Sequence, residues 1–440
     1  MSSDLPRSAR WMIGNHALRL LIGFFLGSWV ARVLGPSQFG VLATATAVGS
    51  IAYSLVELGV RQLLLKELGR RRLLGPVIAG TVFKFWLVSG VFATGILCLW
   101  NAGTHTLPWS VLAATAMPLL LMGVSVHNNW EESCGRAFVS ARNAMAGYLS
   151  AAGARLIAVV LLPTLPVIAW TIAMESVVVS LLGLWTGKKR GRGFWLAGWN
   201  RRVASSILSR GGVLFISQAG SLLLLRVDTM MIEHISGATE TGIYGAAVRL
   251  SELAYALSPI LVTLLLPRLA KLKTVDRQAA FHDATGLGFS IAALLGYASA
   301  VGLWLVGGLI IQGLFGTVYQ PSIPVLMIHC LAAVPFFLGE WRHAVLVALD
   351  RPRLTAFFSW LALALNVSLN LLWIPSYGAQ GAAWATLVSY SLGALVATWF
   401  VADLRWIARL QGAALLEPLR WCWQPKRRWL HLKSVLAVLS

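Results

Sequence analysis

The sequence predicts an all-α polytopic membrane protein with about twelve transmembrane helices, arranged as two related six-helix lobes around a central cavity. Hydrophobic residues make up 58% of the 440 residues and charged residues only 12%. A soluble chain of this length needs far more charge to cover its surface. Twelve apolar stretches are long enough, or nearly so, to cross a bilayer, and the basic residues concentrate in alternate segments between them.

The order of the expected spans follows directly from the apolar stretches. They cover residues 11–33, 40–59, 77–100, 108–127, 144–162, 166–185, 211–232, 242–266, 284–311, 324–347, 354–374 and 381–401. Six alternate connecting segments contain no Lys or Arg: 34–39, 101–107, 163–165, 233–241, 312–323 and 375–380. By the positive-inside rule these segments face outward, and both termini are expected in the cytoplasm.

The domain organisation is expected to follow a repeat. We predict a first six-helix lobe at 1–205 with a basic inter-lobe loop, a second at 206–402, and a basic Trp-rich cytoplasmic tail at 403–440. A shift of 202 residues places Gly35 on Gly237 and Gly40 on Gly242. An even number of spans in each half makes this a parallel repeat, and two such lobes facing each other would enclose a cavity.

The net charge of +20 belongs mostly to segments expected at the cytoplasmic face, where anionic lipid headgroups attract it. It therefore indicates membrane lipids as partners and not nucleic acid. Residues 60–72 and 267–277 alternate leucines with cations at helical spacing, which is typical of interfacial amphipathic helices. The tail at 403–440 is interpreted in the same way, as a surface-lying anchor.

Cations inside the spans are the main candidates for substrate contacts, because a charge in hydrocarbon is costly and usually marks a pathway. Arg155, near the middle of its span, has no acidic residue nearby in sequence and is the best single candidate. His16 and Arg19 share one helical stripe, and Arg19 either reaches the interface or faces an aqueous cavity. Lys84 leaves the same choice open. Arg249 either faces the cavity or pairs with the acid three residues after it.

Three acids could couple transport to protons or Na⁺: Glu175, Glu252 and Asp228. For each of them a purely structural role remains an alternative, as an ion pair or as a neutral buried acid. Cations outnumber acids within the spans, so a cavity lined by them would suit an anionic solute, such as one that carries phosphate.

Catalysis, metals and cofactors find little support in the sequence. The outward segments are short and carry no cluster of Asp, Glu or His, and P-loop, GxSxG and HExxH motifs are absent. The four cysteines lie far apart without metal-ligand spacing. We expect no enzyme activity, no catalytic residues, no metal and no cofactor.

Several short motifs resemble one known family. The segment at 32–40 is similar to the turn between the first two helices of polysaccharide transporters of the O-antigen flippase (Wzx-like) type, in the multidrug/oligosaccharidyl-lipid/polysaccharide exporter superfamily. The other segments that resemble this family, in its order, are 237–244, 313–316, 348–353, 366–370, 374–379 and 381–386. The resemblance covers nearly the whole chain.

The resemblance implies export of an undecaprenyl-diphosphate-linked oligosaccharide from the inner to the outer leaflet of the bacterial inner membrane by alternating access. It implies surface polysaccharide assembly (O-antigen, capsule or exopolysaccharide) with a glycan polymerase and other assembly proteins as partners. In that family a cationic lumen holds the anionic substrate, which Arg19, Arg155 and Arg249 could supply here.

Departures from related branches keep other functions open. The lipid II flippase branch typically has fourteen helices, and the multidrug branch uses acids in its first lobe, whereas span one here offers His16 and Arg19. The main alternative is a cation-coupled multidrug-type efflux transporter. A membrane-embedded glycan polymerase or ligase is a third, but it requires a large outward loop with catalytic residues.

Overall fold

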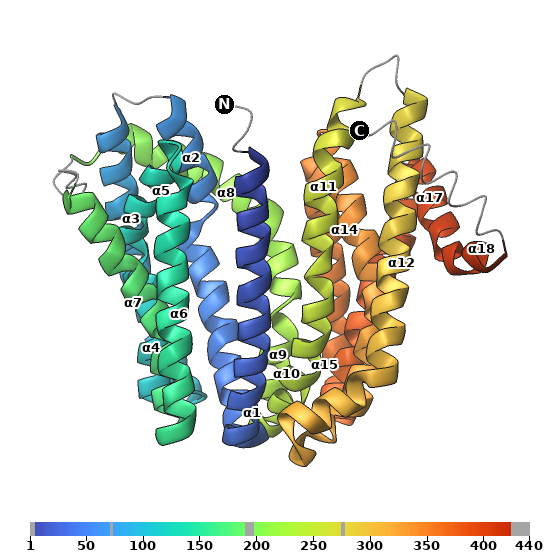
Figure 1. The fold of residues 1–440 in the computed structure, drawn as a ribbon, viewed down its shortest axis with the longest axis horizontal. Helices are drawn as coiled ribbons and strands as arrows, with labels where there is room; N and C mark the ends of the chain where they lie inside the picture. The colour runs from blue at the N-terminus through green and yellow to red at the C-terminus, as the bar shows by residue number, and fades with distance from the viewer. Residues whose placement is uncertain (1–4, 71–73, 190–197, 274–277, 424–440) are drawn as a thin grey trace. The chain divides into compact units, whose positions relative to one another are not determined.

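The computed structural model describes residues 5–70, 74–189, 198–273 and 278–423, and every regular element in these ranges is helical (Figure 1). Contacts divide the chain into two compact units, 1–219 and 220–440. This division lies within a helix, a little beyond the boundary at 205 that the sequence suggests, and it groups the C-terminal segment with the second unit.

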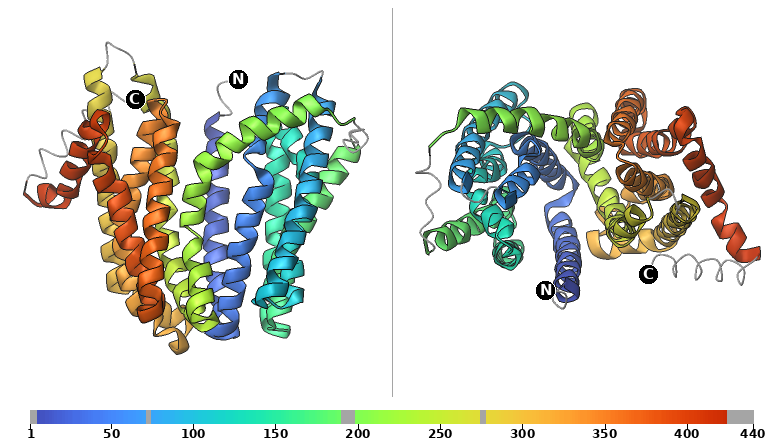
Figure 2. Two further views of the ribbon diagram at one scale, coloured as in Figure 1. Left: turned by 180° about the vertical axis from the view of Figure 1, so that it is seen from behind. Right: turned by 90° about the horizontal axis from the view of Figure 1, so that it is seen from above.

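Unit 1 contains the spans of the first half. Its helices are α1 (Leu5–Glu57), α2 (Val60–Arg70), α3 (Gly75–Thr104), α4 (Trp109–Leu120), η2 (Met122–Ser125), α5 (Val126–Ser133), α6 (Ala137–Leu161) and α7 (Leu165–Lys189). Helix α8 (Arg201–Leu224) then carries the chain into unit 2. The first part of α8 runs across one end of the unit 1 helices (Figure 2).

Unit 2 contains the second half. Its helices begin with α9 (Val227–Ser236), α10 (Ala238–Tyr255), α11 (Leu257–Lys271), α12 (Gln278–Ile310), η5 (Ile311–Phe315), η6 (Thr317–Tyr319), α13 (Ser322–His329) and η7 (Cys330–Ala332). They continue with α14 (Ala333–Ala348), α15 (Pro352–Ser391), η8 (Leu392–Val396), α16 (Ala397–Trp399), η9 (Ala402–Leu404), α17 (Arg405–Leu415) and α18 (Glu417–Trp423).

The helices account for twelve crossings. Nine segments of the described chain are long and apolar enough to span a membrane. Two of them, Leu18–Gly69 and Pro352–Trp399, each contain two crossings, because non-helical residues interrupt them at Gly35 and Gly378. The remaining crossing is α8 with α9, which falls outside the nine. The predicted all-helical, twelve-span architecture is thus confirmed.

The glycines that the 202-residue shift aligns adopt the same backbone conformation. Gly35 has φ 73° and ψ 168°, and Gly237 has φ 84° and ψ 177°. This region of the backbone map is essentially closed to residues with a Cβ. In each unit this conformation interrupts the helix between two antiparallel crossings. Gly35 and Gly237 therefore form equivalent turns.

The two units also share a helix end that the sequence did not reveal, at Gly135 in unit 1 and Asp350 in unit 2. Gly135 (φ 75°) ends α5 and Asp350 (φ 57°) ends α14, and an arginine follows each. The Arg136 N–H donates to the Glu131 carbonyl at 2.9 Å, and the Arg351 N–H donates to the Leu346 carbonyl at 2.9 Å. Both are helix C-caps in which a left-handed residue redirects the chain.

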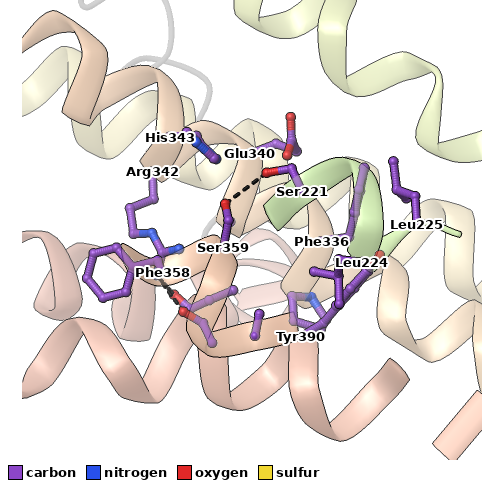
Figure 3. A pocket seen from close by; sticks show the side chains of 15 residues that line it. Ser221, Leu224, Leu225, Phe336, Glu340, Arg342, His343, Phe358, Ser359 and Tyr390 are labelled. Atoms are coloured by element: carbon purple, nitrogen blue, oxygen red, sulfur yellow. Dashed lines mark hydrogen bonds between the residues drawn. The ribbon is translucent and has the colours of Figure 1, made fainter. Parts of the chain in front are cut away.

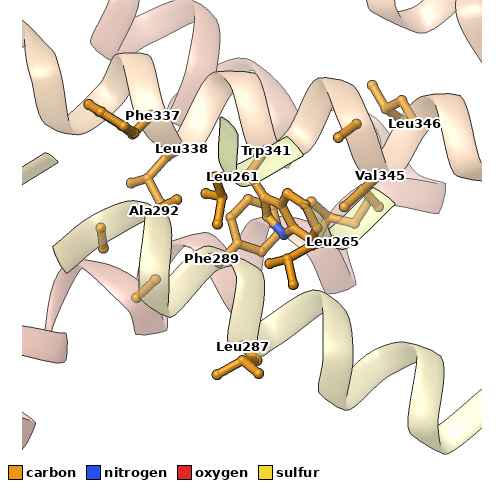
Figure 4. Packing of buried hydrophobic residues seen from close by; sticks show 14 of the residues in the cluster. Leu261, Leu265, Leu287, Phe289, Ala292, Phe337, Leu338, Trp341, Val345 and Leu346 are labelled. Carbon is orange, nitrogen blue, oxygen red and sulfur yellow. The ribbon is translucent and has the colours of Figure 1, made fainter. Parts of the chain in front are cut away.

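Packing in unit 2 depends on close approach of small and large residues. Trp341 is almost fully buried, and a Cβ on Gly288 would lie 2.0 Å from its Cε2 atom. The Trp341 indole N–H donates to the Thr285 carbonyl at 3.0 Å, so its polar end is satisfied. Leu261, Leu265 and Phe289 surround this indole (Figure 4). Small residues at such contacts let membrane helices approach closely.

Candidate functional site: polar clusters within the membrane-spanning helices

The structure brings Arg19 and Glu175 together in unit 1. The Arg19 guanidinium donates through Nη2 to Glu175 Oε1, which joins the first span to α7, and each side chain is 32% exposed. The guanidinium also lies 4.6 Å from the centroid of the Tyr148 ring, and the Tyr148 hydroxyl donates to the Arg19 carbonyl at 2.7 Å. A predicted substrate cation and a predicted coupling acid therefore form one cluster.

Close packing of α6 on α7 sets this geometry. A Cβ on Gly147 would lie 2.4 Å from Val179 Cγ2 and 2.9 Å from the Glu175 carbonyl oxygen. The absent side chain thus lets the α7 backbone approach the α6 turn that carries Tyr148. The position of Glu175 beside Arg19 depends on this contact.

Arg155 lies on the same stripe of α6, seven residues or two turns beyond Tyr148. Its Nε donates to the Thr171 hydroxyl at 3.3 Å, and Thr171 is four residues before Glu175 on α7. No carboxylate of the described residues lies within ion-pairing distance of Arg155. The guanidinium is thus half-buried, bonds a neutral hydroxyl, and has Glu175 as an acid in its electrostatic surroundings without forming an ion pair with it.

The structure says less about the surroundings of the other three predicted substrate contacts, Lys84, Arg249 and His16. Lys84 on α3 and Arg249 on α10 are both half-buried. The side chain of His16 lies outside the described part of the chain. Substrate binding by these three residues stays a prediction.

Asp228, on α9 of unit 2, is buried in a network of neutral donors. Its Oδ2 accepts from the Tyr244 hydroxyl and the Thr386 hydroxyl, both at 2.6 Å. Its Oδ1 accepts from the Asn370 Nδ2 at 2.6 Å, and the same amide donates to Asn366 Oδ1 at 3.1 Å. The side chain is 4% exposed, and none of these contacts supplies a positive charge.

Two atoms of this network are left without partners. Asn370 Oδ1 and Asn366 Nδ2 are buried and form no hydrogen bond in the structure. A buried carboxylate with neutral neighbours favours a bound cation or a proton. The donor set, with carboxylate, amide and hydroxyl oxygens, suits a hard cation such as Na⁺ and lacks the soft ligands of transition metals. Of the three predicted coupling acids, Asp228 has the most enclosed site.

Glu252 has a different environment. It accepts from Arg226 Nη1 at 3.3 Å, a contact that joins α10 to the α8–α9 junction, and both side chains are more than a third exposed. Its charge is therefore already compensated by a cation. Ion coupling at Glu252 and at Glu175 stays a prediction.

Arg342, on α14, is held by backbone and not by acids. Its Nη1 donates to the carbonyls of Gly393 at 2.7 Å and Ala394 at 3.0 Å, and to the Thr398 hydroxyl at 3.0 Å. These acceptors lie in or next to the π-helical turn η8. The guanidinium also lies 4.0 Å from the Phe358 ring centroid. Arg342 thus serves the packing of an irregular helix turn.

A pocket lies beside Arg342 within unit 2 (Figure 3). Its polar lining includes Glu340, His343 and Tyr390, and its remaining lining is mostly apolar. The hydroxyls of Ser221 and Ser359 lie 2.8 Å apart at its wall.

Sequence reasoning missed the amides and hydroxyl that complete the Asp228 site. Asn366 and Asn370 are four residues apart in a mostly apolar span, which places both on one helix face. That spacing was an available signal. Thr386 lies in a segment that resembles the family, but its residue type gave no signal of a contact with Asp228, because a lone threonine in a membrane helix usually bonds its own helix, as Thr386 also does to the Ala382 carbonyl.

Two curated proteins, both described as probable membrane transporters, are similar to this chain in sequence. The chain is 24% identical over 413 residues to the probable flippase AglR of Haloferax volcanii, covering 90% of this chain and 83% of the relative. It is 25% identical over 214 residues to the probable multidrug resistance protein NorM of Caulobacter vibrioides, covering 45% and 44%.

Solved structures share the fold. The lipid II flippase MurJ in an inward closed conformation has a TM-score of 0.70 at 13% identity, covering 97% of this chain and 96% of that one. An inward-facing multidrug resistance MATE family transporter of the MOP superfamily has a TM-score of 0.66 at 15% identity, covering 90% and 96%. The family model described as polysaccharide biosynthesis protein matches residues 7–273. The chain therefore belongs to the polysaccharide biosynthesis protein family, and it is a multi-pass membrane transporter with the fold of the MOP superfamily.

Proposed function

We propose that this protein is a flippase that moves an undecaprenyl-diphosphate-linked oligosaccharide from the inner to the outer leaflet of the bacterial cytoplasmic membrane. Its product would feed surface polysaccharide assembly, with a glycan polymerase as a downstream partner. Family membership and the alignment with a probable flippase over 90% of the chain support this class of substrate. The positive-inside rule supports cytoplasmic termini. Transport without catalysis is part of the proposal.

The observation that carries the proposal is the environment of Arg155. Its guanidinium is half-buried in a membrane span, contacts the Thr171 hydroxyl, and forms no direct ion pair with a described carboxylate. A cation held in this way attracts a diphosphate strongly, because the low dielectric of the surroundings screens the charge less than water does. The Arg19 cluster on the same stripe of α6 and α7 offers a second guanidinium, which the anion could draw away from Glu175.

The experiment measures the leaflet location of lipid-linked oligosaccharide with a probe restricted to the outer surface, in cells that lack the chromosomal copy. Wild-type chain should restore outer-leaflet exposure. Arg155→Ala should lower it about 10- to 100-fold at equal membrane abundance, the range expected for a lost charged hydrogen bond. Arg155→Lys should retain part of the function, because it keeps the charge.

Arg142→Ala is the matched control, since Arg142 lies on the same helix but is exposed. This variant should restore outer-leaflet exposure of lipid-linked oligosaccharide to the wild-type level. Unchanged outer-leaflet exposure in cells without this chain, with no redundant flippase present, would reject the flippase. Wild-type flipping by Arg155→Ala would instead reject only the role of this arginine.

We propose in addition that the Asp228 cluster binds the coupling ion, a proton or Na⁺. A buried carboxylate without a cationic partner, next to the unsatisfied Asn370 Oδ1, supports this role. It also suits the second candidate function, cation-coupled efflux of small amphipathic molecules, which the partial likeness to NorM favours. An efflux pump would lower drug accumulation in a pump-deficient host and leave lipid-linked glycan where it was.

A further inference from the structure

A second cavity lies within unit 1, away from Arg155, and has a different composition. It is bordered by α2, α3 and the first part of α8. Six of its lining residues are apolar: Leu63, Leu64, Leu74, Ile78, Val82 and Val203. Its polar lining consists of Ser206, Glu67 and two arginines, Arg202 and Arg210.

The arginines of this cavity are available for a ligand. Both are exposed, and Arg202 forms no ion pair with a described residue. Arg210 Nη1 lies 3.8 Å from Glu67 Oε1, and its side chain is 66% exposed, so this ion pair is loose and solvated. Two guanidiniums thus face one carboxylate, which leaves the rim with an excess of positive charge.

The apolar part of the cavity is also unusual for an exposed site. Leu74, at the start of α3, is 52% exposed although it lines the cavity. Ile78 and Val82 follow at four-residue spacing on α3, so the three side chains form one continuous apolar strip. The strip leads from the exposed end of α3 toward its buried middle, because the exposed fraction falls to 6% at Ile78 and 0% at Val82.

An apolar strip that begins at a cationic rim matches the chemistry of one ligand class, an anionic lipid. We propose that this cavity binds an anionic phospholipid, whose phosphate contacts Arg202 and Arg210 and whose acyl chain lies on Leu74 and Ile78. The site belongs to the basic end of unit 1, where the positive-inside rule places the leaflet that is richest in anionic lipid. Since α8 carries the chain from unit 1 into unit 2, the bound lipid contacts the connecting helix directly.

The test is native mass spectrometry of the full chain, titrated with phosphatidylglycerol and, in parallel, with phosphatidylcholine of the same acyl chains. Wild-type protein should retain phosphatidylglycerol preferentially. In the double variant Arg202→Ala/Arg210→Ala this preference should fall about 30-fold, the effect of removing two cations next to an anionic surface. Replacing both with Lys should preserve most of it, because a phosphate accepts a point charge.

Two further variants separate a built site from general charge attraction. Arg405→Ala/Arg409→Ala removes two exposed cations from α17 and should retain phosphatidylglycerol as wild type does. Leu74→Glu, at an exposed position, should weaken binding by placing a carboxylate on the strip. Equal retention of both lipids, or equal loss in the α17 variant, would overturn the proposal. Displacement of phosphatidylglycerol by a polyprenyl diphosphate at equal concentration would also overturn it and assign the cavity to the transport substrate.

Discussion

Arg19 and Glu175, which are 156 residues apart in the chain, form an ion pair inside unit 1 beneath the ring of Tyr148. Each charge makes the other tolerable in an apolar surrounding, since an isolated buried charge is far more costly than a paired one. An anionic ligand that engages Arg19 would compete with Glu175 for the same guanidinium. If Arg19 contacts the substrate as proposed, the pair would connect substrate binding with the charge state of Glu175.

The coupling within this pair is measurable with a double-mutant cycle. Glu175→Gln and Arg19→Met should each lower the free energy of unfolding by about 1 kcal/mol, because each leaves a partly buried charge without its partner. The double variant should lose less than the sum of the two. Thermal unfolding of the purified protein gives all four values, and strictly additive losses would show that the two side chains do not interact.

Substitution of the two equivalent turn glycines should destabilise both units. Gly35→Ala and Gly237→Ala should each cost about 1–3 kcal/mol, because a Cβ is strained in this backbone region. No atom lies within 4 Å of the Cβ that would be added at either position, so the cost is conformational and not steric. Gly302→Ala in α12 is the control, since it also meets open space but is helical, and it should be neutral or slightly stabilising. Equal thermal midpoints for all three variants would contradict the argument.

The Asp228 network should determine the ion dependence of transport. Thr386→Val keeps the shape of the side chain but removes the hydroxyl that donates to Asp228 Oδ2. We expect a weaker response of flipping to Na⁺ or to the proton gradient, by about tenfold in the ion concentration needed. Asp228→Asn should abolish the response, since it removes the charge.

Ser368→Ala is the control for these variants, because Ser368 lies on the crossing of α15 that carries Asn366 and Asn370 but its hydroxyl bonds only its own backbone, at the Ala364 carbonyl. It should respond as wild type does. Transport in proteoliposomes at graded Na⁺ and pH distinguishes the two ions. An unchanged ion response in Asp228→Asn would remove this residue from the coupling mechanism.

Arg342 should be more important for stability than for transport. Arg342→Met leaves the Gly393 carbonyl without the guanidinium donor, whereas the Ala394 carbonyl still accepts from Gln411 Nε2 at 3.0 Å, and we expect the free energy of unfolding to fall by about 1–3 kcal/mol. Any protein that remains folded should flip substrate at a rate close to wild type. Arg409→Ala on the exposed face of α17 should leave stability unchanged. A stable Arg342→Met protein that fails to transport would assign Arg342 to the pathway instead.

Hydropathy, the distribution of cations and one internal repeat were sufficient to predict the twelve crossings and their all-helical class. Their signals are local, because a span needs only a continuous apolar stretch and a turn needs only a residue that can adopt its backbone angles. Gly35 and Gly237 illustrate this, since a fixed shift in the sequence identified two residues with the same conformation. The positions of Arg155 and Asp228 within spans were equally visible, although their roles stay predictions.

Partners across helices were decided only by the tertiary structure. The sequence could not place Glu175 on Arg19, bring Asn370 and Thr386 to Asp228, or give Arg342 to the carbonyls of an irregular turn. These contacts depend on helix rotation and on close approaches such as Gly147 against Val179, which are set by packing over the whole unit. The residue types and their depth in the membrane follow from the sequence alone, whereas the pairing of their charges requires the fold.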